Sequence, residues 1–356
     1  LSDGAILQPV DEAAVQAAAA LLAQRGIESV AICFLHSYRN PANEHRARDV
    51  LQAAMPNLYV SVSSEVWPQM REYERALAAV MNGYVGRRMQ RYFTDLEAGV
   101  QALGVPAAVL TTKSNGGIMT AAEAGVRPVE TLLSGPASGV IGAAFIARAA
   151  GIDNIITFDL GGTSADVAVI EGTPRTSTEN HVGDFPVIMP AIDVTSIGAG
   201  GGSIAYVDSS GVLKVGPESA GADPGPACYG LGGSRATVTD AYVSLGILDP
   251  ARFLGGRLVL QPELARAALT ELGEKLGLGV AETAEAILHV ATSQMYSALV
   301  PLLARKGVAY ESFTLLAFGG GGPSHAFLLA RDVGIGRVLI PPHPGVLCAA
   351  GSLAAD

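Results

Sequence analysis

Apolar and polar positions along the first 150 residues follow two periods in turn, one helical and one strand-like. Helical spacing of apolar residues covers three stretches: 10–25, 43–54 and about 71–103. The first stretch has Asp11 as a candidate N-cap and stops at Gly26. Short apolar or alternating runs predict three strands: 29–36, 58–64 and 107–113. This alternation of helices and strands indicates an α/β layer arrangement.

The pattern changes near residue 150. A helix of small residues is predicted to end at about 151, and the runs 154–162 and 165–172 then predict two strands joined by a short turn. The elements predicted after the turn are a loop-rich stretch, a helical region and a strand, 172–250, 262–304 and 313–322, followed by a helix that begins near Pro323. We therefore expect a boundary near 148–152, with one domain over 1–150 and a second over 151–356.

Composition indicates a folded protein with a large core, because 49% of the residues are apolar and only 16% are charged. The net charge of −10 argues against a general binder of nucleic acid or anionic membranes. A local anion site built from backbone amides needs no positive charge. The uncharged run 286–304 contains His289 and several hydroxyl and amide side chains, which favours a buried helix over a membrane span. The three cysteines show no CxxC spacing, which favours a reducing, cytoplasmic setting and gives no zinc signature.

The turn after the strand 154–160 carries the first candidate site. Two carboxylates, Asp159 and Asp166, frame it. Between them lie two glycines whose amides can approach a phosphate and two hydroxyls that can donate to it: Gly161, Gly162, Thr163 and Ser164. Asp159 can hold Mg²⁺ through water, because that ion usually keeps several waters in protein sites. A glycine hairpin capped by aspartates is the alternative, and the hairpin by itself leaves both open.

Two further glycine clusters follow predicted strands, where open α/β sheets usually bind ligands. They are Gly198, Gly200, Gly201 and Gly202 in one loop, and Gly319, Gly320, Gly321 and Gly322 in the other. The first cluster indicates close approach by a ligand or another backbone, with a flexible loop as the alternative. The second precedes Pro323 at a helix N-terminus, which suits an anion or the sugar–phosphate edge of a nucleotide. It is not a P-loop, because no Gly-Lys-Ser/Thr follows.

Other polar residues give weaker indications. We favour turn formation over catalysis for Asp223 and Asp240, since aspartates are frequent in turns. The histidines show no spacing that predicts a metal triad. Each is expected to be structural, and this expectation is weakest for His325 because glycines surround it.

These motifs together resemble the family of hydantoinase A and 5-oxoprolinase proteins, which includes the ATP-binding subunits of acetone carboxylases. The matching stretches follow the order of the family along almost the whole chain: FLHSYRNPANEHRA, SSEVWPQMREYERA, SNGG, LLSGPASGVIGA, FDLGGTSADV, IGAGGGSIA, ADPGPACYG, TVTDA, AFGGGGPSHA and PPHPGVLCAAG. Ten ordered motifs make the resemblance specific.

The resemblance implies an actin-like ATPase architecture, in which two ribonuclease-H-like lobes hold ATP between them. It makes FDLGGTSAD the second phosphate motif and AFGGGGPSHA the adenosine motif. The helix 346–356 resembles the one that returns to the first lobe. The first phosphate hairpin of the family is absent, so we expect a fragment with lobe I incomplete and lobe II nearly complete, inactive alone.

The implied chemistry is ATP-dependent opening of a cyclic amide such as a hydantoin or 5-oxoproline, by phosphorylation of the lactam oxygen. The expected cofactors are ATP and Mg²⁺, with Asp159 as metal ligand and catalytic residue, Asp166 as a second catalytic carboxylate, and the glycine, threonine and serine positions named above as nucleotide contacts. A hydantoinase B-type subunit or domain is the expected partner. The alternatives are an ATP-dependent ketone carboxylase subunit and a nucleotide-binding regulatory module.

Overall fold

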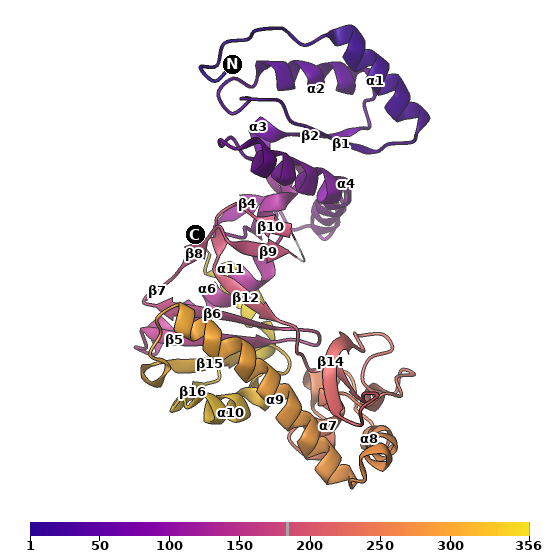
Figure 1. Ribbon diagram of the computed structural model, residues 1–356, viewed down its shortest axis with the longest axis vertical. Coiled ribbons are helices and arrows are strands. Elements are labelled where there is room, and N and C mark those ends of the chain that lie inside the picture. The colour runs from indigo at the N-terminus through magenta and orange to yellow at the C-terminus, as the bar shows by residue number, and fades with distance from the viewer. Residues whose placement is uncertain (183–184, 356) are drawn as a thin grey trace. The chain divides into compact units, whose positions relative to one another are not determined.

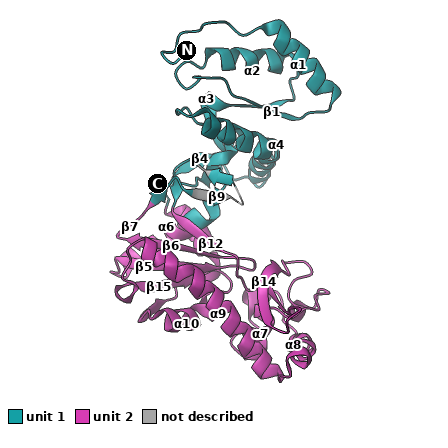
Figure 2. Cartoon of the chain, in the orientation of Figure 1, with its two compact units in different colours: residues 1–137, 176–192, 355–356 teal, residues 138–175, 193–354 magenta. Residues whose placement is uncertain are grey.

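The chain forms two compact units in the computed structural model, which describes residues 1–182 and 185–355 (Figures 1 and 2). Unit 1 comprises 1–137, 176–192 and the C-terminal end, and unit 2 comprises 138–175 and 193–354. Residues 183–184 of the predicted loop-rich stretch, and 356 of the predicted last helix, lie outside the described residues. The identification of the two units with lobes of an actin-like ATPase stays a prediction.

Unit 1 contains the predicted alternation of helices and strands. Its helices are α1 (Glu12–Gln24), α2 (Ala42–Ala54), α3 (Ser63–Val66), α4 (Glu72–Ala102) and α5 (Ala121–Val126). Its strands are β1 (Ser29–Ile32), β2 (Tyr59–Val62), β3 (Leu110–Thr112), β4 (Ile118–Thr120), β8 (Thr176–Ser177), β9 (Asn180–Val182), β10 (Phe185–Val187) and β11 (Ala191–Ile192). β1 and β2 pair in parallel, whereas the other strands form short antiparallel pairs. Asp11 caps α1 as predicted, because its side chain accepts from the Ala14 amide.

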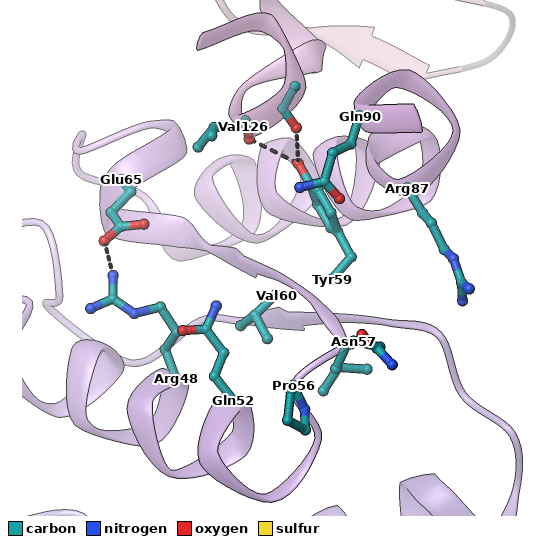
Figure 3. A pocket seen from close by; sticks show the side chains of 12 residues that line it. Arg48, Gln52, Pro56, Asn57, Tyr59, Val60, Glu65, Arg87, Gln90 and Val126 are labelled. Atoms are coloured by element: carbon teal, nitrogen blue, oxygen red, sulfur yellow. Dashed lines mark hydrogen bonds and ion pairs between the residues drawn. The ribbon is translucent and has the colours of Figure 1, made fainter. Parts of the chain in front are cut away.

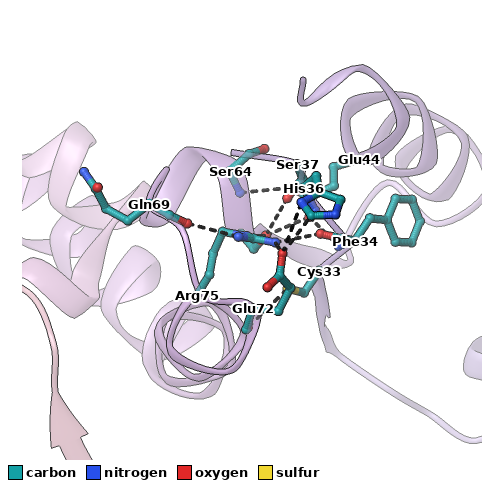
Figure 4. Close-up of polar contacts among 10 residues, drawn as sticks. Cys33, Phe34, His36, Ser37, Glu44, Ser64, Gln69, Glu72 and Arg75 are labelled. Carbon is teal, nitrogen blue, oxygen red and sulfur yellow. Dashed lines mark hydrogen bonds and ion pairs between the residues drawn. The ribbon is translucent and has the colours of Figure 1, made fainter. Parts of the chain in front are cut away.

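A buried guanidinium joins two of the sequence motifs in unit 1 (Figure 4). Arg75 on α4 is fully buried and donates to the carbonyls of Phe34 (2.7 Å) and Gln69 (3.0 Å) and to Ser63 Oγ (3.0 Å). Glu44 on α2, also fully buried, accepts from the Phe34 amide and from Ser63 Oγ, both at 2.7 Å. The two motifs therefore form one hydrogen-bonded polar core, and no reaction chemistry is needed to account for these residues.

Unit 2 is built on a mixed sheet in the order β12-β6-β5-β15-β16, with β7 beside β6. The strands are β5 (Asn154–Leu160), β6 (Ala165–Glu171), β7 (Thr173–Pro174), β12 (Val194–Ile197), β15 (Thr314–Phe318) and β16 (Arg337–Leu339), and a separate hairpin pairs β13 (Ser203–Val207) with β14 (Leu213–Ser219). The predicted hairpin is confirmed: β5 and β6 are antiparallel, and β15 runs parallel to β5. The stretch 172–250, predicted as loop-rich, also contains the short strands β7 to β14 and the helix α7. Its glycines and prolines separate elements of only a few residues.

Helices cover both faces of this sheet. The helices of unit 2 are α6 (Ser134–Ala149), α7 (Val238–Ser244), α8 (Pro262–Leu276), α9 (Val280–Arg305), α10 (Gly322–Val333) and α11 (Leu347–Leu353), of which α7 and α8 lie in a separate core away from the sheet. The α9 and α10 side chains pack on the face that carries Phe158. α6 lies against the opposite face, where Gly139 approaches the Phe318 ring. Unit 2 thus has a helix–sheet–helix layer order.

α9 belongs to two separate hydrophobic cores (Figure 1). Its N-terminal half packs with α7 and α8 through Ile287 and Ala291, whereas its C-terminal half packs on the sheet through Met295 and Leu299. Among the described residues this is the one helix long and apolar enough to cross a membrane by length and composition. Buried core helices of soluble proteins meet the same criteria, and the contacts of α9 with both cores account for its apolar residues.

Candidate functional site

The two carboxylates of the predicted hairpin lie side by side on adjacent strands of the sheet. Asp159 on β5 and Asp166 on β6 are direct partners in the antiparallel register, so their side chains lie on the same face. Burial raises the pKa of both carboxyls. For Asp159, a hydrogen bond from Cys348 opposes the rise and the charge of Asp166 adds to it. The arrangement disfavours two uncompensated negative charges and suits a bound cation.

The turn of the hairpin is held by the first glycine loop. Gly201 donates its amide to the Gly161 carbonyl at 2.9 Å, and Gly202 donates to the Gly162 carbonyl at 2.6 Å. A Cβ on Gly200 would lie 2.6 Å from the backbone of Gly162 and Thr163. The approach of another backbone therefore explains why glycine occupies this loop.

The second glycine loop, residues 319–322, follows β15, which pairs with β5 on the side away from β6. β15 pairs with β5 so that Phe318 is opposite Asp159, and the Gly321 amide donates to the Leu160 carbonyl at 2.9 Å. Gly319 has φ +80°, and a Cβ there would clash with Asp159 Oδ1. All three candidate stretches thus meet around the end of β5, although the sequence separates them by up to about 160 residues.

A cavity of about 90 Å³ lies where these loops converge. Six of the predicted nucleotide positions line it: Gly161, Gly162, Gly201, Gly202, Gly320 and Gly321. The other six candidates do not line it: Thr163, Ser164, Gly198, Gly200, Gly319 and Gly322. Gly200 and Gly319 contribute by allowing close backbone approach, and Thr163 Oγ1 is hydrogen-bonded to Ser219 Oγ at 3.4 Å.

Beside Gly221, Thr239, Tyr242 and Ser324, the cavity has an apolar and aromatic wall that we did not predict. It is formed by Pro226, Tyr229, Leu248 and Phe253, with the Tyr229 and Phe253 ring centroids 5.5 Å apart. Such a wall suits the flat face of a heterocyclic base. The signal in the sequence is slight, because these residues lie in irregular segments without periodicity.

Asp240 and His325 have structural partners. Asp240 accepts from the amides of Thr237 (2.9 Å) and Cys228 (2.7 Å) and completes a capping box at the start of α7. His325 is fully buried between Tyr242 (2.7 Å to Nδ1) and Thr292 (3.1 Å to Nε2), and burial lowers its pKa to about 4. The structural role favoured for Asp240, and for His325 as for each of the histidines, agrees with this geometry.

A second cavity, of about 590 Å³, lies within unit 1 between α2, β2 and α4 (Figure 3). Arg48 on one side is paired with Glu65, and Arg87 on the other is paired with Glu28 at 2.6 Å. The Tyr59 hydroxyl donates to the Val126 carbonyl at 2.8 Å. None of the candidate residues from the sequence lines this cavity, and its cationic groups already have carboxylate partners.

Models of one protein family match almost the whole chain, and curated relatives match all of it or nearly so. A family model described as hydantoinase/oxoprolinase matches residues 75–356, and a model of the N-terminal region of that family matches residues 1–55. The chain is 38% identical over its full length to caprolactamase subunit alpha of Pseudomonas jessenii and spans 51% of that subunit. It is 35% identical over 99% of its length to the 5-oxoprolinase PfmaA of Pestalotiopsis fici, of which it spans 28%.

Solved structures agree with the sequence comparison. A nucleotide-free acetone carboxylase chain matches with a TM-score of 0.87 and 29% identity, over 98% of this chain and 50% of that one. The ATP-dependent caprolactamase of P. jessenii matches with a TM-score of 0.81 and 38% identity, over 100% of this chain and 52% of that one. The chain therefore spans about half the length of the caprolactamase and acetone carboxylase chains and 28% of the 5-oxoprolinase, and the resemblance predicted from its motifs is confirmed. The chain belongs to the hydantoinase/oxoprolinase family.

Proposed function

We propose that unit 2 binds the phosphates and base of ATP in the cavity at the end of β5. The observation that carries this proposal is the meeting of three glycine loops, distant in sequence, around one pair of carboxylates. The amides of Gly161, Gly201 and Gly202 already donate to the carbonyls of Ser164, Gly161 and Gly162, so the Gly162 and Gly320 amides at the cavity would meet the phosphate oxygens, without a basic side chain. The Tyr229–Phe253 wall is the candidate surface for the base.

The donor set at the hairpin fits Mg²⁺. Asp159 and Asp166 are two partly buried carboxylates whose pKa values are raised chiefly by burial, and Mg²⁺ is usually held by one or two carboxylates together with waters and phosphates. Asp159 and Asp166 would hold the ion, which would neutralise charge on the phosphates during transfer. The hydroxyls of Thr163 and Ser164 at the turn would donate to phosphate oxygens.

For the complete protein we propose ATP-dependent opening of a cyclic amide. A lactam carbonyl is a poor electrophile, and transfer of the γ-phosphoryl group to its oxygen would create an imidate-like ester that water can attack. The work of the protein is then to position the two reactants and to neutralise charge. The identity to a caprolactamase subunit and to a 5-oxoprolinase supports this reaction class. Since caprolactamase subunit alpha is by its name one of several subunits, we expect a partner subunit or domain of the hydantoinase B type for hydrolysis.

A second candidate is an ATP-dependent ketone carboxylase subunit. The observation that favours it is the TM-score of 0.87 with an acetone carboxylase chain. Both candidates use the same nucleotide site, and in both we propose two ribonuclease-H-like lobes in the actin-like arrangement, of which unit 2 supplies the second. We expect this chain by itself to be inactive, and the complete protein to work in the cytoplasm.

The nucleotide site is tested by calorimetric titration of the complete protein with Mg·ATP. Asp159→Asn is expected to weaken Mg²⁺-dependent binding by about tenfold or more, since a hydrogen-bonded charge of this kind contributes about 1.5–3 kcal/mol. Asp95→Asn, on the exposed surface of α4, is the matched control and should bind as the wild type does. Equal affinity in all three proteins would exclude the metal assignment. Lactam-dependent phosphate release then favours the hydrolase, and release that requires a ketone and bicarbonate favours the carboxylase.

A further inference from the structure

Helix α11 packs against α6 with close contact between the two backbones. A Cβ on Gly351 of α11 would overlap the Ser138 carbonyl of α6, and a Cβ on Gly142 would lie 2.8 Å from the Leu347 carbonyl. Ser352 Oγ donates to Ser138 Oγ at 3.1 Å. Because Gly142 and Gly351 allow this close approach, backbone contact determines the spacing of the two helices there.

This seating brings the thiol of Cys348 to the carboxylate of the hairpin. Cys348 Sγ donates to Asp159 Oδ2 at 3.4 Å, a distance suited to a sulfur donor. On its other side a Cβ on Gly139 would lie 3.0 Å from Cys348 Sγ, so the thiol is held between α6 and β5.

The two oxygens of Asp159 therefore have different neighbours. Oδ2 accepts from the thiol, whereas Oδ1 lies against Gly319, where any Cβ would clash with it. The terminal torsion of an aspartate is otherwise broad. Contacts on both oxygens restrict this torsion, and the Cys348 contact is the one that comes from a hydrogen bond.

We propose that Cys348 is a positioning residue for Asp159, holding its carboxylate in a single orientation toward the phosphate loops. The proposal rests on the proposed nucleotide site, since Asp159 matters to a reaction only if phosphate and metal bind there. Cys348 itself forms no bond with the reactants. It acts through α11, so the packing of small residues on α6 contributes directly to the geometry of the site.

The test compares two substitutions that differ in the ability to donate. Cys348→Ala removes the donor and Cys348→Ser retains one in nearly the same place. In the complete protein we expect Cys348→Ala to lower kcat by about tenfold with the KM for Mg·ATP changed by less than about twofold, because misplacement of a reacting group reduces rate more than binding. Cys348→Ser should restore kcat to within about threefold of the wild type. Cys33→Ala, at a partly exposed cysteine of unit 1, is the matched control and should leave kcat unchanged.

A readout independent of activity is the orientation of Asp159 in crystal structures of the wild type and both variants. We expect one carboxylate orientation in the wild type and in Cys348→Ser, and a rotated or split one in Cys348→Ala. Thermal unfolding of each variant establishes that it is folded. The proposal is overturned if Cys348→Ala keeps the wild-type kcat and Asp159 orientation, or if Cys348→Ser loses as much activity as Cys348→Ala while folded. Failure of the wild type to bind Mg·ATP would instead overturn the proposed function on which it rests.

Discussion

The buried imidazole of His325 is expected to make unit 2 less stable as the pH falls, because its hydrogen bonds fit only the neutral ring. Thr292 donates its hydroxyl hydrogen to the Leu288 carbonyl at 2.7 Å, so it can only accept from His325 Nε2. Nδ1 then has no hydrogen and accepts from the Tyr242 hydroxyl at 2.7 Å. The folded chain thus holds the neutral tautomer with hydrogen on Nε2, and a second proton would break the bond from Tyr242.

The magnitude follows from the two pKa values. Burial lowers the pKa of His325 from 6.5 to about 4, while the charge of Asp332 opposes the shift. Below pH 6.5 the unfolded chain takes up a proton that the folded chain does not, so stability falls with pH until about pH 4. Above pH 6.5 the contribution is fully present. At about 1.36 kcal/mol for each unit of pKa, the loss between pH 7 and pH 4 is about 3 kcal/mol, a large part of the total of about 5–15 kcal/mol for a typical protein.

The measurement is urea unfolding followed by circular dichroism at pH 7 and pH 4, for the wild type and His325→Gln. Glutamine keeps one donor and one acceptor but does not titrate. Asp159 and Asp166, whose raised pKa values act in the opposite direction, are present in both proteins and cancel in the difference. The fluorescence of Trp67, the single tryptophan, reports unit 1 separately. If the difference in unfolding free energy between the two proteins is the same at both pH values, the neutral buried imidazole is wrong.

Two further predictions concern stability. Gly319→Ala should lower the free energy of unfolding, measured by thermal unfolding, by about 2–4 kcal/mol, because φ is +80° and the new Cβ lies 2.7 Å from the Leu160 carbonyl. The control is Gly320→Ala, which has no atom within 4 Å of its Cβ and should change this free energy by less than about 1 kcal/mol. Arg75→Met should lower the free energy of unfolding of unit 1 by about 3–5 kcal/mol, since three acceptors lose their buried donor; urea unfolding followed by Trp67 fluorescence measures it. The control Arg91→Met, at an exposed arginine, should lower it by less than about 0.5 kcal/mol. Equal effects within either pair would contradict the corresponding packing argument.

The sequence was most informative where its pattern is local and long. The helices α1, α2 and α4 follow from periodicity, and the β5–β6 hairpin follows from two apolar runs around a glycine turn, which also places Asp159 opposite Asp166. The meeting of the glycine loops was expected through the resemblance to a family, since no local pattern encodes a contact between Gly201 and Gly161.

The residues that were missed have a common physical cause. Tyr229 and Phe253 lie in irregular segments, where an aromatic side chain has no period that would indicate the direction it faces. Cys348 was given no place in the candidate site, because a lone cysteine has no signature in the sequence. Its position near Asp159 depends on α11 meeting α6, a contact between residues more than 200 positions apart. Long-range packing of this kind is decided by the whole fold rather than by the neighbours in sequence.

The division of α9 between two cores has a mechanical consequence. The glycine loops at the end of β5 belong to the sheet, on which the C-terminal half of α9 packs, whereas Pro226 and Tyr229 belong to the region of α7 and α8, on which its N-terminal half packs. The glycine loops and the aromatic wall of the cavity are thus supported by opposite halves of α9. The Tyr242–His325–Thr292 hydrogen bonds link α7, α10 and α9 where the two halves of α9 meet, so a bend of α9 at this place would move the two sides of the cavity relative to each other.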